Sequence, residues 1–243
     1  MSDPLFLVPE LPEAGAFRLD GAEGHHAADV QRLRVGQALT LADGRGGLAS
    51  AVVATVAKGA LELSVIHRET SAIADPRIVA VQGIAKGDRG ELAVQAMTEA
   101  GVDEIVPWTA ERCVTQWRGE RGDRALERWR STAREAAKQA RRAWLPEIAP
   151  ASSTRGVVDR FRSGRCTGLV LHEQAQARLS TVELPDSGEI AMVIGPEGGI
   201  SDAELELFVG AGAVAVRLGS PVLRTSTAGV AALAVLSARV GRW

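Results

Sequence analysis

The chain has 243 residues, of which 46% are hydrophobic and 24% charged, and its formal net charge at pH 7 is −2. These proportions exclude an intrinsically disordered chain, which is less apolar and more unevenly charged. The longest apolar run, Ala228–Leu236, is too short for a membrane span, which needs about 20 residues. The two cysteines, Cys113 and Cys166, fit neither a disulfide framework nor a zinc site. We therefore expect a cytoplasmic protein that binds no metal and no membrane.

The N-terminal part of the chain is typical of strands. Short aliphatic runs are separated by turn signals such as Asp43-Gly44 and Lys58-Gly59, and they occupy residues 5–8, 15–19, 38–43, 47–56 and 61–66. Residues 25–34 are expected to form the one helix in this part. The pattern predicts a small antiparallel β-barrel over residues 1–72, followed by a linker within residues 68–76.

From Pro76 onward, strands alternate with helices. Apolar strands are expected at 77–82, 104–108, 168–173, 190–195 and 213–219. Helices are expected at 91–101, at 123–144 with Asp123 as N-cap, after the capping box of Ser201 and Glu204, and at 228–239. Because each strand is apolar throughout, residues 73–243 are predicted to form an α/β domain with a parallel sheet covered on both faces.

Positive charge is concentrated in residues 111–142. This segment has ten basic and five acidic side chains, so it carries +5 while the rest of the chain carries −7. A basic patch on an acidic body favours docking of a polyanion at one place. The alternative is a solvated helix face with ion pairs one turn apart.

Three strand ends carry unusual residues, and ligands of parallel sheets bind beyond the carboxyl ends of the strands. The first is His172-Glu173, after an apolar strand. The second is GPEGG at 195–199, whose glycines permit a sharp turn and a close approach to a ligand. It lacks the lysine of a phosphate-binding loop, and Glu197 suits a ligand with positive charge. The alternative for this segment is a plain turn.

The third strand end is LGSPVLRTSTAG, residues 218–229. Arg224 lies in the middle of this loop beside apolar Val222 and Leu223, a combination that can line a pocket for a flat heterocycle. The alternative is one exposed arginine followed by the helix-capping hydroxyls of residues 225–227.

Together, VIGPEGGISDAE and VRLGSPVLRTSTAG resemble the SPOUT superfamily of S-adenosylmethionine-dependent RNA methyltransferases. More narrowly, the chain resembles the bacterial 16S ribosomal RNA uridine N3-methyltransferase family. Three further stretches match that family in order: HHAADVQRLRVGQ, KGDRGELAVQAMTEAGVDEIVPW and ERWRSTAREAAKQARRAWLPEI. This chain departs from the family at Pro221 and Ser226, and it has Ala140-Arg141 where the family often has a small residue and glycine.

The resemblance implies a fold and partners that periodicity alone does not give. The C-terminal half would be a SPOUT-type parallel sheet with a deep trefoil knot, preceded by a PUA-like RNA-binding barrel. The protein would be a homodimer with its pocket at the dimer interface. It would transfer a methyl group from S-adenosylmethionine to N3 of a uridine in 16S ribosomal RNA, with an assembled small subunit as the expected substrate.

The resemblance also assigns residues. Arg224 would stabilise charge on the uracil, and His172, Glu197 or water would take the N3 proton. The methyl donor would be held by Leu171, His172, Ile194, Gly195, Glu197, Gly199, Leu218, Gly219, Leu223, Thr225 and Ala228. RNA would be bound by His25, Arg32, Arg34, Lys86, Arg134 and Arg142.

Two alternatives remain. The departures at Pro221 and Ser226 allow a non-catalytic protein that binds ribosomal RNA through a degenerate knot. The glycine loop allows a nucleotide-phosphate transferase, against which the missing lysine and Glu197 argue.

Overall fold

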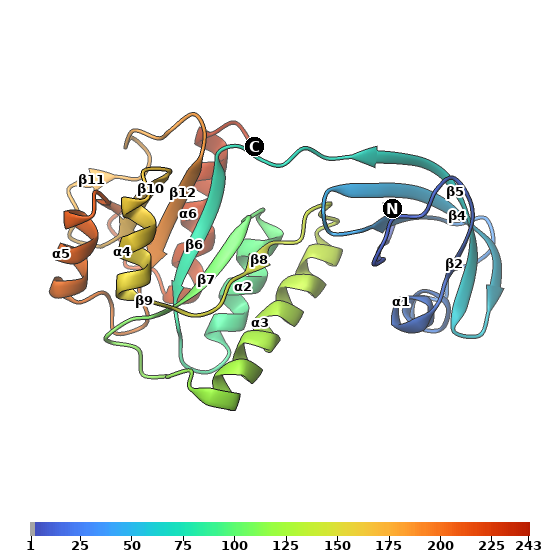
Figure 1. Ribbon diagram of the computed structural model, residues 1–243, viewed down its shortest axis with the longest axis horizontal. Coiled ribbons are helices and arrows are strands. Elements are labelled where there is room, and N and C mark those ends of the chain that lie inside the picture. The colour runs from blue at the N-terminus through green and yellow to red at the C-terminus, as the bar shows by residue number, and fades with distance from the viewer. Residues whose placement is uncertain (1–2) are drawn as a thin grey trace. The chain divides into compact units, whose positions relative to one another are not determined.

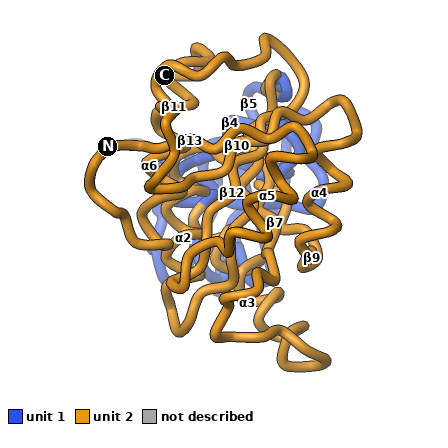
Figure 2. Tube along the Cα trace, turned by 90° about the vertical axis from the view of Figure 1, so that its left-hand side faces the viewer, with its two compact units in different colours: residues 1–73, 137–145 blue, residues 74–136, 146–243 orange. Residues whose placement is uncertain are grey.

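The structure, a computed structural model, describes residues 3–243, and the chain divides into two compact units (Figure 2). Unit 1 comprises the residues up to Ile73 together with Ala137–Leu145, and unit 2 comprises Ala74–Ala136 and Pro146–Trp243. Within the described residues, no helix is both long enough and apolar enough to cross a membrane.

Unit 1 is built on a five-stranded sheet with strand order β1-β3-β4-β5-β2. Its strands are β1 (Leu5–Leu7), β2 (Gly15–Leu19), β3 (Ala38–Ala42), β4 (Gly47–Ala57) and β5 (Ala60–Thr70). β4 and β5 form a hairpin whose turn places Gly59 at φ +70°, a conformation that glycine adopts without strain. The buried side chains of this unit include Phe6, Leu39, Leu41 and Leu61.

Two expectations for unit 1 need correction. β1 pairs with β3 in parallel, so the sheet is not wholly antiparallel; β2 and α1 lie between these two strands in the chain, and a parallel pair needs such a long connection. The expected helix at 25–34 begins and ends earlier. It consists of α1 (Gly21–His25) and a π-helical turn η1 (His26–Val30), and Arg32 at φ +54° ends the helical backbone.

The segment Ala137–Leu145 belongs to unit 1 although it lies in the middle of the chain. Lys138 is 6% exposed, and its Nζ donates to Oε1 of Glu23 on α1 at 3.0 Å. Trp144 Nε1 donates to the Ser71 carbonyl at 3.0 Å, and the Leu145 amide donates to the Gly44 carbonyl at 3.0 Å. These contacts fasten the segment to both ends of the unit's sequence.

Unit 2 contains a wholly parallel sheet, as the apolar strand pattern predicts, with order β11-β13-β10-β12-β6-β7-β8 and β9 beside β7. The strands are β6 (Arg77–Gly83), β7 (Glu104–Thr109), β8 (Glu147–Ile148), β9 (Ser152–Ser153), β10 (Cys166–Leu171), β11 (Ala177–Arg178), β12 (Glu189–Ile194) and β13 (Val214–Arg217).

Helices cover both faces of this sheet (Figure 1). On one face lie α2 (Arg89–Glu99), α3 (Gly119–Gln139) and α6 (Thr225–Arg239), which share a core with residues such as Ile78 and Ile190. On the other lie α4 (Thr154–Arg162) and α5 (Asp202–Gly210), packed on Val79 and Val193. The capping box of Ser201 and Glu204 at the start of α5 is confirmed.

The long helix α3 differs from its prediction at both ends. It begins at Gly119, so Asp123 lies within the helix and is not its N-cap. It ends at Gln139 because Arg141 adopts φ +53°. The Arg142 amide then donates back to the Ala137 carbonyl at 2.9 Å, which is the hydrogen bond that closes many helices through a left-handed residue.

Two other helices also depart from expectation. Helix α4 is absent from the predicted elements, although Ser153 accepts a hydrogen bond from the Gly156 amide as its N-cap. Helix α6 begins at Thr225, three residues early, with Arg224 as its N-cap and no side-chain capping bond. The hydroxyl of Thr225 therefore serves another purpose, described below.

Arg160 on α4 joins two strands at the amino-terminal edge of the sheet. Its guanidinium donates to Glu104 at 2.7 and 2.8 Å and to Glu189 at 2.5 and 2.7 Å. Burial raises the pKa of Glu189, but hydrogen bonds from Arg160 and Cys166 outweigh it and hold that pKa below its usual range. Burial and the neighbouring Glu189 raise the pKa of Cys166 to about 12, so this thiol stays protonated.

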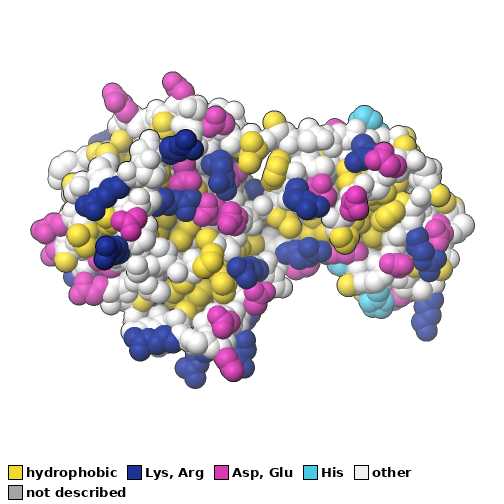
Figure 3. All heavy atoms as spheres, viewed as in Figure 1, with side chains coloured by type: hydrophobic (Ala, Val, Ile, Leu, Met, Phe, Trp, Pro, Cys, Tyr) yellow, Lys and Arg dark blue, Asp and Glu magenta, His cyan; other side chains and the backbone are white. Residues whose placement is uncertain are grey.

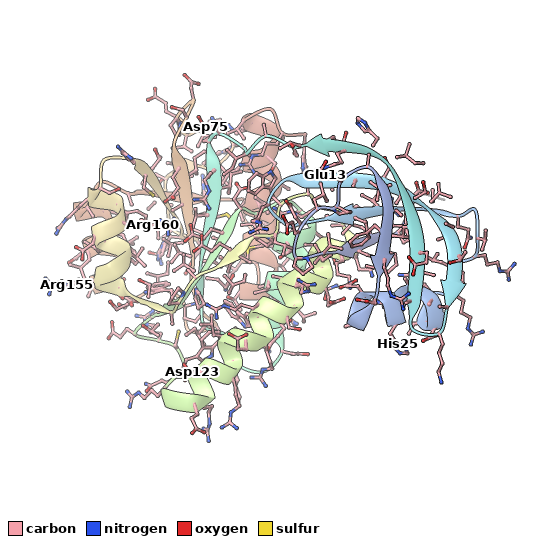
Figure 4. All side chains as sticks on the ribbon, turned by 45° about the vertical axis from the view of Figure 1, so that its right-hand side comes forward. Glu13, His25, Asp75, Asp123, Arg155 and Arg160 are labelled. Atoms are coloured by element: carbon pink, nitrogen blue, oxygen red, sulfur yellow. The ribbon has the colours of Figure 1, made fainter. Side chains whose placement is uncertain are left out.

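We predict that Arg160→Ala destabilises unit 2 by about 3 kcal/mol, because it removes the guanidinium that hydrogen-bonds two largely buried carboxylates and leaves Arg77, 3.7 Å from Glu104, as the neighbouring cation. Arg155→Ala is the matched control, since Arg155 lies on the same helix but is exposed and points away from the sheet (Figure 4); it should cost less than about 0.5 kcal/mol. Urea unfolding measures both.

The loss should depend on pH. Because the pKa of Glu189 is lowered in the folded state, its contribution is present above the ordinary glutamate pKa of about 4.3 and fades as the pH falls further. The difference between wild type and Arg160→Ala should therefore shrink in acid. If wild type and Arg160→Ala were equally stable at neutral pH, the proposed role of Arg160 would be contradicted.

Candidate functional site

A cavity of about 590 Å³ lies where β6, β10 and β12 end, and these are neighbouring strands in the sheet order. Three loops form its walls: the one after β10, the GPEGG loop after β12, and the loop between β13 and α6. A smaller cavity adjoins it at the end of β13 and shares several of its residues. The site therefore lies at the edge of the sheet that the strand ends predict.

The structure brings the residues predicted for donor binding and catalysis together. Ten of them line the larger cavity: Leu171, His172, Ile194, Gly195, Glu197, Gly199, Leu223, Arg224, Thr225 and Ala228. The remaining two, Leu218 and Gly219, line the adjoining cavity.

Glu197 fastens the GPEGG loop to the segment that follows β6. Its Oε1 accepts from the Arg89 guanidinium at 3.0 Å and from the Lys86 amide at 3.1 Å. Burial raises the pKa of this carboxyl, but its own backbone amide, Arg89 and the Lys86 amide together hold the pKa below its usual range. Glu197 is therefore a carboxylate with its charge engaged, and a weaker base than a free glutamate.

Thr225 links the GPEGG loop to the loop before α6. Its hydroxyl donates to the Gly195 carbonyl at 2.8 Å and accepts from Gln82 Nε2 at 2.8 Å. Gln82 is fully buried on β6, and its Nε2 also donates to the Gly83 carbonyl at 3.1 Å. Three strand ends are thus held together through one hydroxyl.

His172 follows β10, and its amide donates to the Val216 carbonyl at 2.9 Å. The Gln174 amide lies 3.3 Å from His172 Nδ1 and donates to it. With Nδ1 accepting, the neutral imidazole carries its proton on Nε2. The ring therefore presents a hydrogen-bond donor rather than a free acceptor at Nε2.

Arg224 is exposed at the start of α6. Among residues 3–243 its guanidinium makes no hydrogen bond or ion pair, so its donors are available to a ligand in the cavity that it lines.

Three charged residues that were not predicted from the sequence also line the cavity, namely Arg89, Arg112 and Asp202. Arg112 lies in the loop after β7, and its guanidinium approaches the Gly198 and Ile200 carbonyls at 3.4 Å. Both arginines follow the carboxyl ends of predicted strands. Applying the strand-end rule to every strand, rather than to three, would have found them.

The predicted RNA-binding residues are divided between the units. In unit 1, Arg32 and Arg34 are exposed, His25 is exposed with its Nδ1 2.7 Å from Asp29, and Arg142 is half-buried. In unit 2, Lys86 and Arg134 are exposed. Figure 3 shows Lys and Arg side chains gathered over the beginning of α3, with acidic side chains among them. No group of three potential metal ligands occurs among the described residues.

Comparison with known proteins assigns both parts of the chain. Residues 74–237 match the RNA methyltransferase domain family and residues 19–66 match the RNA methyltransferase PUA domain family. The fold and the strand-end cavity thus belong to the RNA methyltransferase class.

Full-length relatives narrow this class. The chain is 44% identical to ribosomal RNA small subunit methyltransferase E of Mycobacterium bovis over 98% of this chain and 93% of that relative. It is 28% identical to the protein of that name from Bacillus subtilis over 94% and 92%. The crystal structure of the Neisseria gonorrhoeae enzyme bound to S-adenosylmethionine is 31% identical, covers 98% of both chains and superposes with a TM-score of 0.87. The chain belongs to the ribosomal RNA small subunit methyltransferase E family.

Proposed function

We propose that this protein transfers the methyl group of S-adenosylmethionine to N3 of a specific uridine in 16S ribosomal RNA. The observation that carries the proposal is the larger cavity at the strand ends, in which most of the residues expected for the donor meet Arg224, a cation with no protein partner among residues 3–243. The cavity is formed despite the departures at Pro221 and Ser226, which speaks against a degenerate, non-catalytic site.

The residues of the cavity fit the donor. Its volume of about 590 Å³ lies within the usual range for small-molecule sites. Leu171, Ile194 and Leu223 offer apolar surface for an adenine. Glu173 and Asp202 offer negative charge to a sulfonium and an ammonium group. Gly199 adopts φ +73°, which keeps the loop backbone close to the cavity.

S-adenosylmethionine supplies a methyl group on a positively charged sulfur. The protein must hold uridine N3 in line with that methyl at about 3 Å. As the N3–H proton is lost, negative charge develops on the two neighbouring carbonyl oxygens. Arg224 stabilises this charge, because a planar guanidinium donates several hydrogen bonds and stays protonated. Its position after the last strand brings it to the same cavity.

The other two residues expected for catalysis are Glu197 and His172, and in this proposal neither of them takes the N3 proton. Glu197, engaged with Arg89 and the Lys86 amide, braces the loop that holds the donor. His172 donates through Nε2, since its Nδ1 accepts from Gln174. The N3 proton then leaves to water, which was among the acceptors that the sequence left open.

The finer architecture is also part of the proposal. Unit 1 would close as a PUA-like barrel that binds RNA, and the loops after β12 and β13 would thread as a SPOUT-type trefoil knot. The substrate would be the assembled small subunit, and the protein would act in the cytoplasm as a homodimer.

A direct test uses small subunits that lack the native modification. The purified protein and S-adenosylmethionine should add one methyl to them, and mass spectrometry of the digested nucleosides should identify N3-methyluridine. Methylation at another position, or none, would overturn the proposed function.

We predict that Arg224→Ala lowers kcat and kcat/KM together by roughly 10²–10³-fold, the effect of removing one donor that stabilises charge in a transition state. Affinity for S-adenosylmethionine, measured by calorimetry, should change little. Arg224→Lys should recover activity only in part, because a point charge cannot bridge two oxygens. Arg155→Ala is the control and should retain full activity. If Arg224→Ala weakens only donor binding, Arg224 is a donor-loop residue.

We predict a homodimer that forms through unit 2. Helix α6 carries half-buried apolar side chains such as Val230 and Val235, and Val222 beside the cavity is 76% exposed. A second copy would cover this surface. Light scattering at micromolar concentration should give the mass of two chains, and a monomer would contradict the prediction.

RNA affinity should depend on salt through the basic segment. Each phosphate contact removed flattens the slope of log affinity against log salt by about one unit. Replacing Arg134 and Arg142 together with alanine should thus flatten the slope by up to about two units, while Arg155→Ala leaves it as in the wild type. An unchanged slope would mean that the segment is a solvated helix face.

A further inference from the structure

A separate cavity, of about 490 Å³, lies in unit 2 beside the beginnings of α2 and α3, away from the two cavities at the strand ends. It is lined by Ala85, Gly87, Asp88, Gly90, Glu91, Thr115, Trp117, Ala125, Arg128 and Trp129. None of these residues lines the cavity of about 590 Å³ described above, which we call the methyl-transfer cavity. Arg89, within the same short segment, does line it. Residues 85–91 therefore form a wall between the two cavities.

Two indole rings form an aromatic corner in this second cavity. The ring centroids of Trp117 and Trp129 are 4.9 Å apart and the planes are inclined at 78°. Trp129 is 2% exposed. Even so, its Nε1–H donates to no acceptor among residues 3–243 and is not one of the side-chain atoms sealed from solvent.

Gly90 keeps this indole N–H open. A Cβ at that position would lie 3.0 Å from Trp129 Nε1 and 2.8 Å from Cζ2, so a larger residue would cover the donor. An indole N–H that opens onto a cavity can donate to an acceptor of a ligand there, and tryptophan N–H groups usually have such a partner.

The rim of the cavity offers acceptors and positive charge. The carboxylate of Asp88 is exposed and makes no hydrogen bond or ion pair among the described residues. Glu91 Oε1 lies 3.5 Å from Arg128 Nε. Arg128 belongs to the segment 111–142 with its net charge of +5, and Lys86 adjoins the wall.

We propose that this tryptophan cavity, defined by the ten residues above, binds one unstacked base of the RNA next to the target uridine. The base stacks on Trp117 and accepts a hydrogen bond from Trp129 Nε1. Its exocyclic amino group donates to Asp88 or Glu91, so adenine, cytosine or guanine is bound in preference to uracil, which has no amino group.

The inference rests on the proposed function for the identity of the strand, and on the shared wall for the position of the base. Because residues 85–91 border both cavities, a strand whose uridine enters the first can place a neighbouring base in the second. Arg128, which lines the second cavity, then faces the phosphate next to the bound base. Aromatic stacking of splayed bases is the usual means by which proteins recognise single-stranded RNA.

The first experiment measures RNA affinity of the full-length protein. Trp117→Ala should weaken binding of a single-stranded RNA that contains the target uridine by about five- to 100-fold, the range expected for one stacked base. Trp117→Phe should restore most of the affinity. The salt slope and the affinity for S-adenosylmethionine should stay as in the wild type, because neither depends on stacking. Trp243→Ala, which removes a tryptophan that is 67% exposed, is the control.

The second experiment does not need methyl transfer or RNA. Guanosine monophosphate should quench the intrinsic tryptophan fluorescence more than uridine monophosphate does. Trp117→Ala should abolish the difference, and Asp88→Asn should reduce it. If wild-type protein methylates RNA but Trp117→Ala binds RNA equally well, the inference falls and the proposed function stands. If the wild type shows the base preference but transfers no methyl, the cavity is a base site and the proposed function falls. Equal quenching by both nucleotides overturns the inference.

Discussion

The hydroxyl of Thr225 holds the ligand-binding edge of this protein together. It donates to the Gly195 carbonyl and accepts from the amide of Gln82, so the loop after β12, the first turn of α6 and the end of β6 are fixed relative to one another. Glu197 adds the second tie, from the GPEGG loop to the segment after β6. Arg224, the residue directly before Thr225, is thereby held at the cavity that it lines.

Residues 85–91, the short segment after β6, border both the methyl-transfer cavity and the tryptophan cavity. Successive residues of this segment line different cavities. Arg89 lines the methyl-transfer cavity, and Asp88 and Gly90 line the tryptophan cavity. Glycines at 87 and 90 keep the segment thin. One piece of backbone thus borders both the proposed donor site and the proposed base site, and a distortion at either cavity would be felt at the other.

The parallel sheet and the place of the cavity could be predicted from the sequence, whereas the end of α3 and the role of the Thr225 hydroxyl could not. The parallel sheet and the cavity at its edge follow from apolar strands with polar residues at their ends, as Leu171-His172 and Ile194-Gly195 show. The end of α3 could not be predicted, because an arginine at φ +53° in place of glycine leaves no local signal. The sequence predicts a helix-capping role for Thr225, because Ser and Thr are preferred at that position; its bond to Gln82 joins residues 143 positions apart. The aromatic corner likewise could not be predicted, because Trp117 lies in the loop before α3 and reaches Trp129 only through the path of that loop.

Unit 1 is not a continuous piece of the chain, and this matters during synthesis on the ribosome. Its sheet strands are complete by Thr70, but Lys138, Trp144 and Leu145 belong to the same unit. Chains generally fold from the N-terminus as they emerge, yet here the first unit waits until more than half of the chain has been made. Until then Glu23 lacks its lysine and Ser71 its indole partner. All five strands of the sheet are therefore made before the segment that contacts Glu23, Gly44 and Ser71, and that segment follows only after α3.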